Sequence, residues 1–377
     1  MKKGRVVEQF FATVNSILVA IDDFIWGVPL MVLILAGGIL LTVRLHGLQF
    51  SKLPRALRYM MKNEKGEDAH GEVSSFGALC TALSATIGTG NIVGVATAIV
   101  AGGPGAMFWM WLAALFGMAT KYSEGLLAVK YRSIDKDGHV LGGPFYYIER
   151  GMKQRLPQIS WRWLAKIFAF FGMCVGLFGI GTFTQVNSIN SAITGFFDPD
   201  MAHTVSLFGM EYSLATVIGS LVVAIFVGLV VIGGLQRISS VAQKIIPIMV
   251  VVYVGFSLVL IAVNITALPD ALVTIVESAF GLRAAAGGAL GAIIIAMQKG
   301  IARGIFSNEA GLGSAPIAAA AAQTKEPVRQ GLVSMTGTFL DTIVVCSMTG
   351  LALVMTGAYQ IPGLEGAAVT TAAFQAG

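Results

Sequence analysis

Long apolar stretches separated by short polar segments dominate the pattern of residues along the chain. A helix needs about 20 mostly apolar residues to cross a bilayer, so each long stretch has room for at least one span. The pattern therefore predicts an all-α, polytopic membrane protein with a single transmembrane domain over residues 1–377. The longest stretches without a charged residue lie between Glu72 and Lys121, Lys166 and Asp198, Glu211 and Arg237, and Lys244 and Asp270.

Eight membrane spans follow from this pattern. The seventh predicted span is too long for one straight helix, and it contains several glycines and Pro316, so we expect a broken helix there. Loop 142–150 carries Tyr146 and Tyr147 and is predicted to be an interfacial helix, because aromatic rings favour the headgroup region. The predicted spans are 26–43, 76–100, 106–129, 163–180 with a polar extension to 193, 213–232, 245–263, 287–322 and 332–356.

Composition supports membrane insertion and sets the orientation. Only 12% of the residues are charged, against about 25% in a soluble domain. Basic residues number 18 in one set of alternating segments and 4 in the other, so the richer set is predicted to be cytoplasmic and both termini external. The net charge of +5 does not indicate nucleic-acid binding, because the basic residues form no patch interleaved with aromatic residues. The segments of the basic set are 44–75, 130–166, 236–244 and 323–330.

The first candidate site is the glycine-rich stretch 84–94 inside the second predicted span. A dinucleotide fingerprint would need a preceding strand and an acid about 20 positions later, but no acidic residue follows before Glu124. Close helix packing explains the spacing of Gly90 and Gly94, but not Gly-Thr-Gly-Asn at the bilayer centre. An unwound segment at that depth must be buried or line a cavity, where freed amides face anions and freed carbonyls face cations.

The second candidate site is the stretch 297–316 in the seventh predicted span. Charged residues inside a span mark function or a buried pair, so Lys299, Arg303 and Glu309 either hold the helix pieces together or contact a substrate. The neighbouring residues Phe306, Ser307 and Asn308 are expected to close and line the broken region.

Other polar residues at membrane depth leave alternatives open. Gln185 either makes a hydrogen bond between helices or contacts a ligand. Asp341 either pairs with a basic residue or assists the path of a cation. Lys121 and Glu124, three positions apart on one helical face, are predicted to form a structural ion pair. The four histidines lie in predicted loops and no nucleophile–base group gathers in the spans, so no catalytic residue and no enzyme are predicted.

The two glycine-rich stretches resemble signatures of the alanine/glycine:cation symporter family. The matching segments are Gly-Thr-Gly-Asn-Ile-Val-Gly (88–94), Gly-Gly-Pro-Gly-Ala-Met-Phe-Trp (102–109), Gly-Gly-Pro-Phe-Tyr-Tyr-Ile-Glu (142–149) and Phe-Ser-Asn-Glu-Ala-Gly-Leu-Gly-Ser-Ala-Pro (306–316). The resemblance implies a small neutral amino acid, alanine or glycine, carried with sodium across a bacterial plasma membrane by alternating access. No cofactor is implied beyond the coupling ion. The alternative is a cation-independent or proton-coupled carrier of the same fold.

The resemblance also implies a fold like that of the bacterial leucine transporter, which is a known example of an inverted-repeat transporter. One extra helix (26–43) would precede a five-helix repeat (76–263), and 287–356 would hold the first two helices of a second repeat. Because a full family member has eleven spans, we expect these eight to be C-terminally incomplete and the sequence to be a piece of a longer protein.

Site residues follow from the same resemblance. The amides of Thr89 and Gly90 would bind the substrate carboxylate. The full expected substrate site is Gly88, Thr89, Gly90, Asn91, Gln185, Met297, Gln298, Phe306, Ser307 and Asn308. Sodium would be bound mainly by backbone carbonyls at Ser84, Thr86 and Ile87.

Overall fold

The protein is mostly helical. The computed structural model describes residues 2–25, 27–62, 71–179, 181–207, 209–282 and 288–377, and the expected span edges Trp26, Ile180 and Gly287 lie outside these ranges. Five of its helical segments are long and apolar enough to cross a membrane, or six if a bent pair is one span. The five are Arg162–Phe197, Leu214–Val231, Gly234–Val263, Ala289–Asn308 and Pro327–Thr356.

The second predicted span is a broken helix, as the glycine pattern indicates. Helix α5 (Ser75–Thr86) stops before the glycines, and a π-helical turn, η1 (Gly90–Gly94), leads into α6 (Val95–Gly102). The two halves are bent by 54°. Residues 87 and 88 therefore form a short non-helical step between them, in the position where Gly88 and Gly90 weaken the helix.

The seventh predicted span is broken as well. Helix α14 (Ala289–Asn308) ends where Glu309 takes a left-handed conformation with φ of 53°, and α15 (Ala315–Ala320) resumes after Ser314. Gly311 and Gly313 have φ of 91° and 80°, which glycine adopts without the steric cost of a Cβ atom. The break therefore follows from local chain chemistry.

Helix α7 (Gly105–Lys130) lies at the centre of the bundle and packs against α14 and against α16 (Pro327–Thr338). Glycines allow these close contacts: a Cβ atom at Gly331 would lie 2.7 Å from the carbonyl oxygen of Tyr122. A second π-helical segment, η3 (Phe339–Cys346), follows α16 directly and continues into α17 (Ser347–Thr356). It places residues of the eighth predicted span opposite η1.

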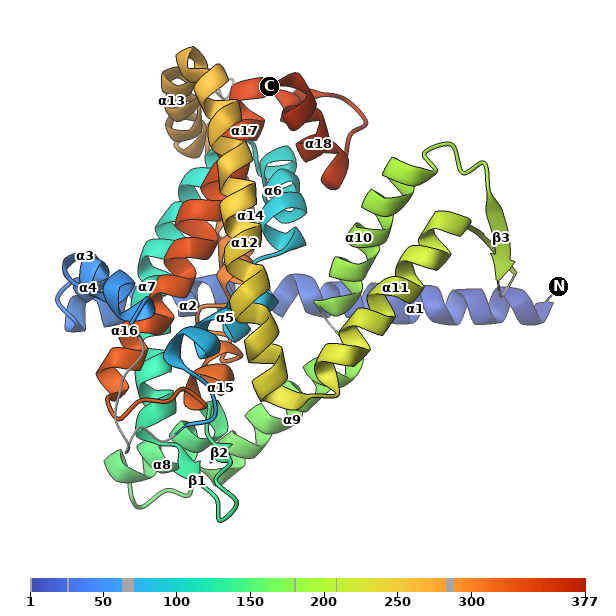
Figure 1. The fold of residues 1–377 in the computed structure, drawn as a ribbon. Helices are drawn as coiled ribbons and strands as arrows, with labels where there is room; N and C mark the ends of the chain where they lie inside the picture. Colours follow the sequence, from blue (N-terminus) through green and yellow to red (C-terminus); the bar gives the residue numbers. More distant parts are fainter. Residues whose placement is uncertain (1, 26, 63–70, 180, 208, 283–287) are drawn as a thin grey trace.

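Helices α9 to α11 stand away from this bundle (Figure 1). The fourth predicted span is two helices, α9 (Arg162–Phe178) and α10 (Thr182–Phe197), divided where Gly179 and Gly181 have φ of 59° and 21°. Neither α10 nor α11 (Leu214–Val231) has a buried residue. The chain returns to the bundle through α12 (Gly234–Val263), which packs against α5 and α17.

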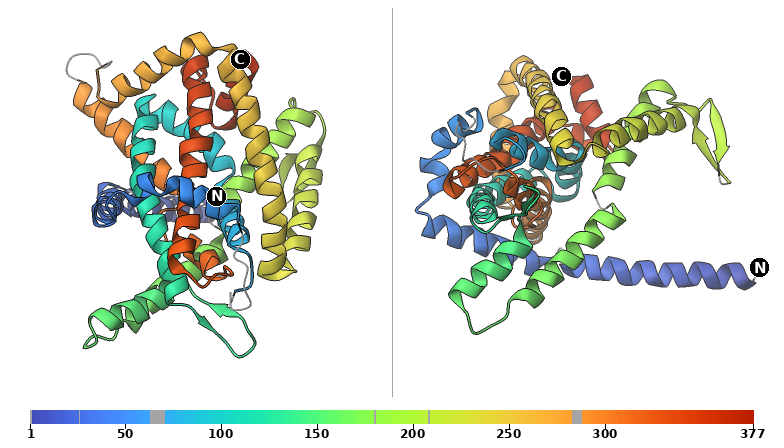
Figure 2. Two further views of the ribbon diagram at one scale, coloured as in Figure 1. Left: turned by 60° about the vertical axis from the view of Figure 1, so that its left-hand side comes forward. Right: turned by 60° about the horizontal axis from the view of Figure 1, so that its bottom comes forward.

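The N-terminal helices lie crosswise to the bundle. Figures 1 and 2 show α1 (Lys2–Ile25) extending sideways from the molecule, with α2 (Val28–Arg44) passing across the vertical helices. Helix α2 contacts α7 and α14. Its 17 residues match the first predicted span in position, whereas α1 was expected to be only an external segment.

At the end of the bundle that carries α8 (Pro144–Arg155), the outer ends of both broken helices are joined. Val73 and Ala322 form a parallel β-bridge, and the N–H of Gln323 donates to the carbonyl of Val73 at 2.7 Å. Arg132, just after α7, donates to the carbonyls of Ala320, Ala322 and Thr324 at 2.6 to 2.9 Å. These bonds hold the start of α5 and the end of α15 together.

Several elements were not anticipated. The described loops contain two short antiparallel hairpins, β1 with β2 and β3 with β4, which the sequence pattern did not predict. Gly138 and Gly209 have positive φ in the turns of these hairpins. The short helices α3, α4, α13 and α18 were not predicted either. The remaining bounds are α3 Leu48–Ser51, α4 Leu53–Met60, β1 Ser133–Ile134, β2 Val140–Leu141, β3 Thr204–Leu207, β4 Met210–Ser213, η2 Ile265–Ala267, α13 Leu268–Ala279, η4 Ala358–Gln360 and α18 Ala367–Ala376.

Candidate functional site

A cavity of about 300 Å³ lies beside the step in the first broken helix. This volume is at the lower end of the range for small-molecule sites. Its wall combines the end of α5, the π-helical turn η1, one face of α10 and the end of α14. The lining residues are Ala85, Thr86, Thr89, Gly90, Val93, Gly94, Gly181, Thr184, Gln185, Asn187, Ser188, Arg303, Phe306, Ser307 and Glu309.

Two backbone N–H groups are available at the wall of this cavity. Within the described residues, neither Thr89 nor Gly90 donates its N–H to a backbone or side-chain acceptor. The helix of α5 has ended and the π-helical bonds of η1 have not yet begun, so these amides have no internal acceptor. Adjacent free amides at a helix start are suited to an anion such as a carboxylate.

Polar side chains of α10 form the opposite wall. Ser188 lies three positions after Gln185 and four after Thr184, so all three side chains lie on the side of α10 that lines the cavity. The side-chain oxygen of Gln185 would lie 3.0 Å from a Cβ atom at Gly88, so the absence of a side chain there allows this approach. The cavity therefore offers hydrogen-bonding groups that can both donate and accept.

The end of α14 contributes both signs of charge. The guanidinium of Arg303 stacks on the ring of Phe306 at 5.3 Å and lies where a side chain at Gly94 would be. Glu309 lines the same cavity and accepts a hydrogen bond from the hydroxyl of Ser314. A zwitterion also carries one positive and one negative charge, so each of its charges has a residue of opposite charge in the cavity wall.

A fully buried hydrogen-bond network lies behind the cavity wall. The Nδ2 of Asn91 donates to Oδ1 of Asp341 at 2.7 Å, while its Oδ1 accepts from the N–H of Gly88 at 2.8 Å. Oδ2 of Asp341 accepts from Ser307 and from Thr342, each at 2.8 Å. The network links η1, α14 and η3, and Ser307 belongs both to it and to the cavity wall.

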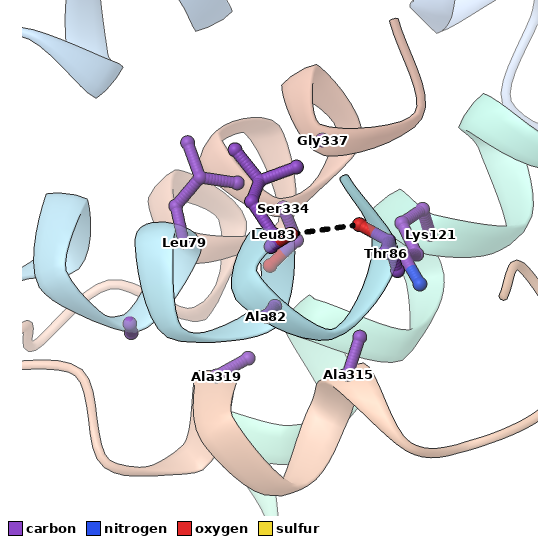
Figure 3. Close-up of a pocket in the computed structure, with 10 residues that line it drawn as sticks. Leu79, Ala82, Leu83, Thr86, Lys121, Ala315, Ala319, Ser334 and Gly337 are labelled. Atoms are coloured by element: carbon purple, nitrogen blue, oxygen red, sulfur yellow. Dashed lines mark hydrogen bonds between the residues drawn. The ribbon is translucent and has the colours of Figure 1, made fainter. Parts of the chain in front are cut away.

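The residues whose backbone carbonyls were expected to bind sodium have side chains in three different environments. Ser84 is exposed and donates to the carbonyl of Thr81, whereas the side chain of Ile87 is buried in an apolar cluster. Figure 3 shows Thr86 at the end of α5, with its hydroxyl directed to the carbonyl of Leu83 and the side chain of Lys121 nearby. Thr86 and Lys121 both line a second, small cavity of about 20 Å³.

Lys121 changes the electrostatics of that gap. Its ammonium is buried, at 4% exposure, and makes no hydrogen bond to any residue that the structure describes. An ammonium at this place repels a second cation. The expected ion pair between Lys121 and Glu124 is wrong as a contact, because no oxygen of Glu124 lies within 4.0 Å of the lysine nitrogen. Glu124 still acts on Lys121 through a longer-range attraction.

The structure separates the remaining expected residues from the cavity. Met297 packs beside Met31 and Ile305 in an apolar cluster. Both Met297 and Gln298 lie more than two turns, or about 12 to 13 Å, before Phe306 along α14. Asn308 is buried and donates to Thr342 at 3.0 Å. Of the expected substrate residues, the cavity brings together Thr89, Gly90, Gln185, Phe306 and Ser307.

Other lining residues were not singled out from the sequence. Thr184 and Ser188 carried a usable signal, because a polar stripe at helical spacing in an apolar span indicates an inward face. Asp341 was noted as a lone acid, but nothing in its own segment identifies Asn91 and Ser307 as its partners. That juxtaposition depends on the packing of three helices.

Two broken helices around a polar cavity, within a bundle of apolar helices, define an integral membrane transporter. Comparison with known proteins agrees: the profile of the sodium:alanine symporter family matches residues 11–377. The chain belongs to this family, whose members are transporters and not enzymes.

Named relatives show the range within the family. The chain is 57% identical to an uncharacterized transporter of Haemophilus influenzae, over 97% of this chain and 75% of that protein. It is 47% identical to the sodium/alanine symporter AgcS of Methanococcus maripaludis, over 98% of this chain and 76% of that protein. It is 40% identical to the probable sodium/glutamine symporter GlnT of Bacillus subtilis, over 93% of this chain and 68% of that protein.

Proposed function

We propose that the protein carries alanine or glycine into a bacterial cell together with sodium, across the plasma membrane. The observation that supports this most directly is the pair of free N–H groups of Thr89 and Gly90 at the cavity wall. They would hold the substrate carboxylate, as a helix start holds an anion. Gln185, Phe306 and Ser307 would complete the site.

The two broken helices support alternating access. In this proposal the chain adopts an inverted-repeat arrangement with one extra N-terminal helix, and one bundle moves against another around the cavity. The stretch 130–166, from the last residue of α7 into the start of α9, carries eight basic residues and would be cytoplasmic. The outward path would then open at the end of the bundle that carries α13 and α18.

Sodium coupling is energetically adequate. One monovalent cation crossing a potential of 100 mV releases about 2.3 kcal/mol, and a tenfold concentration gradient adds about 1.4 kcal/mol. Their sum supports accumulation of the amino acid by roughly several hundredfold at one ion per substrate. The relative AgcS is named for sodium and alanine, which favours this pair of substrates.

Glutamine is a second candidate substrate. The cavity is lined by several groups that could pair with a side-chain amide, including Thr184, Asn187 and Ser188. GlnT, at 40% identity, is named as a probable glutamine symporter. A site built to pair with an amide discriminates strongly against analogues that lack it, so direct competition separates the two substrates.

The test is uptake of radiolabelled alanine into proteoliposomes with an inward gradient of sodium or of choline. We expect uptake to overshoot equilibrium only with sodium, and excess unlabelled glycine to compete more strongly than glutamine. Equal uptake in choline would establish a cation-independent carrier, and uptake driven by a pH gradient alone would establish a proton-coupled one. Stronger competition by glutamine would reassign the substrate.

A further inference from the structure

The elbow between α8 and α9, defined as residues 153–167, carries basic side chains without a protein partner among the described residues. Arg150, just before it, has a structural role: it donates to the carbonyl of Tyr131 at 2.9 Å and stacks on the ring of Tyr146. The basic residues of the elbow are exposed and make no hydrogen bond, ion pair or ring contact with the part of the chain that the structure describes. They are Lys153, Arg155, Arg162 and Lys166.

The positive charge of the elbow is not neutralised by nearby acids. No acidic residue occurs between Glu149 and Asp198. Glu149 is exposed and forms no ion pair with any described residue. The elbow therefore presents a concentrated positive potential, which attracts an anionic partner.

Large apolar side chains are exposed between these basic residues. Leu156, Ile159 and Ile167 are 43% to 46% exposed, and Trp163 is 56% exposed. Exposed apolar side chains beside basic ones are typical of a segment that lies in a membrane interface. Tryptophan is enriched at that depth, because its ring is apolar and its N–H can still reach water or a headgroup.

Helix α9 has one face that packs on the protein and one that does not. Ala165 is buried, and the ring of Phe168 lies 6.2 Å from that of Phe145 and in the place of a side chain at Gly313. The exposed residues of its first two turns form a basic pair and an apolar pair, each four positions apart, on the other side of the helix. A ligand on the exposed face would therefore leave the contact with Gly313 in place.

The position of the elbow favours a lipid as this ligand. Figure 1 shows α8 and the start of α9 at the end of the bundle that is proposed above to be cytoplasmic. The segment that begins at Arg162 is long and apolar enough to cross a membrane, so its first turn would lie at headgroup depth. The cytoplasmic leaflet contains anionic lipids, which attract basic residues next to a span. A soluble acidic partner would match the charge but not the apolar side chains that continue into the span.

We propose that the elbow binds the headgroups of anionic phospholipids through its four basic side chains, while its apolar side chains contact the acyl chains. The inference takes the orientation of residues 130–166 from the proposed function and goes beyond it. Bound headgroups would hold α9 beside the break between α14 and α15, where Phe168 meets Gly313. They would also fix the start of the segment that continues into α10, whose polar face lines the cavity.

The test is a titration of the purified chain in detergent with phosphatidylglycerol or with phosphatidylcholine, followed by native mass spectrometry of the intact complexes. The two lipids carry the same acyl chains, but phosphatidylcholine has no net charge. The test variant combines Arg162→Gln with Lys166→Gln. The matched control combines Arg237→Gln with Lys244→Gln, two exposed basic residues of α12 that are predicted to lie on the same side of the membrane.

We expect the parent chain and the control to bind phosphatidylglycerol at least about tenfold more tightly than phosphatidylcholine. Each basic residue near an anionic lipid surface contributes about fivefold in affinity, equivalent to about 1 kcal/mol. In the test variant the affinity for phosphatidylglycerol should therefore fall by about tenfold or more, whereas the affinity for phosphatidylcholine should not change.

The inference is overturned if the parent chain binds the two lipids equally, or if the test variant binds phosphatidylglycerol as tightly as the parent chain. An equal loss in the control also overturns it, because the preference would then belong to the basic residues of that side in general. If the test variant does not stay monodisperse, Lys153→Gln combined with Arg155→Gln decides the question by the same criterion. No amino acid is present in these titrations, so their outcome is independent of alanine uptake and the two proposals fail separately.

Discussion

The side-chain amide of Asn91 donates a 2.7 Å hydrogen bond to the carboxylate of Asp341, 250 positions later in the chain. This bond joins the π-helical turn of the first broken helix to a second π-helical segment, η3. Such segments widen a helix locally and occur frequently at functional sites. The pair links the step at Gly88 to the interior of the bundle.

Replacing Asn91 with alanine should destabilise the protein. The N–H of Gly88 and Oδ1 of Asp341 would each lose a buried partner, at a cost of about 1–3 kcal/mol per group. We expect a lower unfolding temperature in detergent and loss of alanine uptake. Asn264→Ala is the control, because among the described residues that side chain bonds only the carbonyl of Leu260, in the helix that Asn264 follows. An equal effect of both substitutions would contradict the linking role of Asn91.

Adding a methyl group at Gly90 should shift selectivity toward glycine. No atom lies within 4 Å of a Cβ atom built there, so the variant Gly90→Ala keeps the backbone unchanged and its methyl group fills part of the cavity. One methyl group in a pocket is worth roughly 10- to 200-fold in discrimination. The ratio of glycine to alanine uptake should rise by about tenfold or more.

The control for this substitution is Gly255→Ala in α12, where a Cβ atom also meets open space but no cavity residue. An unchanged ratio in Gly90→Ala, with uptake otherwise intact, would place the substrate side chain elsewhere.

The joined ends of α5 and α15 should move as one body during transport. Val73 and Ala322 are bridged, and Arg132 donates hydrogen bonds to the carbonyls of Ala320, the last residue of α15, and Ala322. In the double variant Val73→Cys, Ala322→Cys, a disulfide should therefore leave alanine uptake within about twofold of the uptake measured with both thiols reduced. A twofold change corresponds to less than about 0.5 kcal/mol.

Val73→Cys alone, treated with the same oxidant, controls for side reactions. A loss of more than about tenfold on oxidation that a reductant reverses, equivalent to about 1.4 kcal/mol, would show that α5 moves independently of α15.

Acid should loosen the hairpin between α10 and α11. The hydroxyl of Ser213 donates to Asp198 at 2.6 Å and the N–H of Ala202 donates at 2.8 Å, and the Ser213 bond in particular lowers the pKa of Asp198 below its ordinary value. A group whose pKa is lowered on folding stabilises the fold above its unfolded pKa, about 3.9 for Asp. That stability is lost as the pH falls through the lower folded value.

Cleavage by pepsin between residues 198 and 213 should thus increase as the pH falls from about 4 toward 2, the range below the ordinary pKa of Asp. In Asp198→Asn the cleavage rate should be high throughout and follow only the pH dependence of pepsin on an unstructured peptide. A parent-like pH profile in Asp198→Asn would exclude Asp198 as the titrating group.

The sequence by itself determined the apolar helices and both helix breaks. Gly88 and Gly90 weaken one span, and Gly311 and Gly313 adopt backbone angles that other residues avoid. These are local properties, set by the residue's own backbone preferences, so they can be recognised without knowing which helices pack together. The same reasoning missed the division between α9 and α10, although Gly179 and Gly181 mark it.

Tertiary structure decided which of these residues share a site. It gave the lone acid Asp341 neutral partners from two other helices, separated Met297 and Gln298 from the cavity, and buried Lys121 beside Thr86. A single buried polar residue shows that it needs a partner but does not specify which one. Partners 34 to 250 positions away are chosen by the packing of η1, α14 and η3, and local periodicity carries no record of that packing.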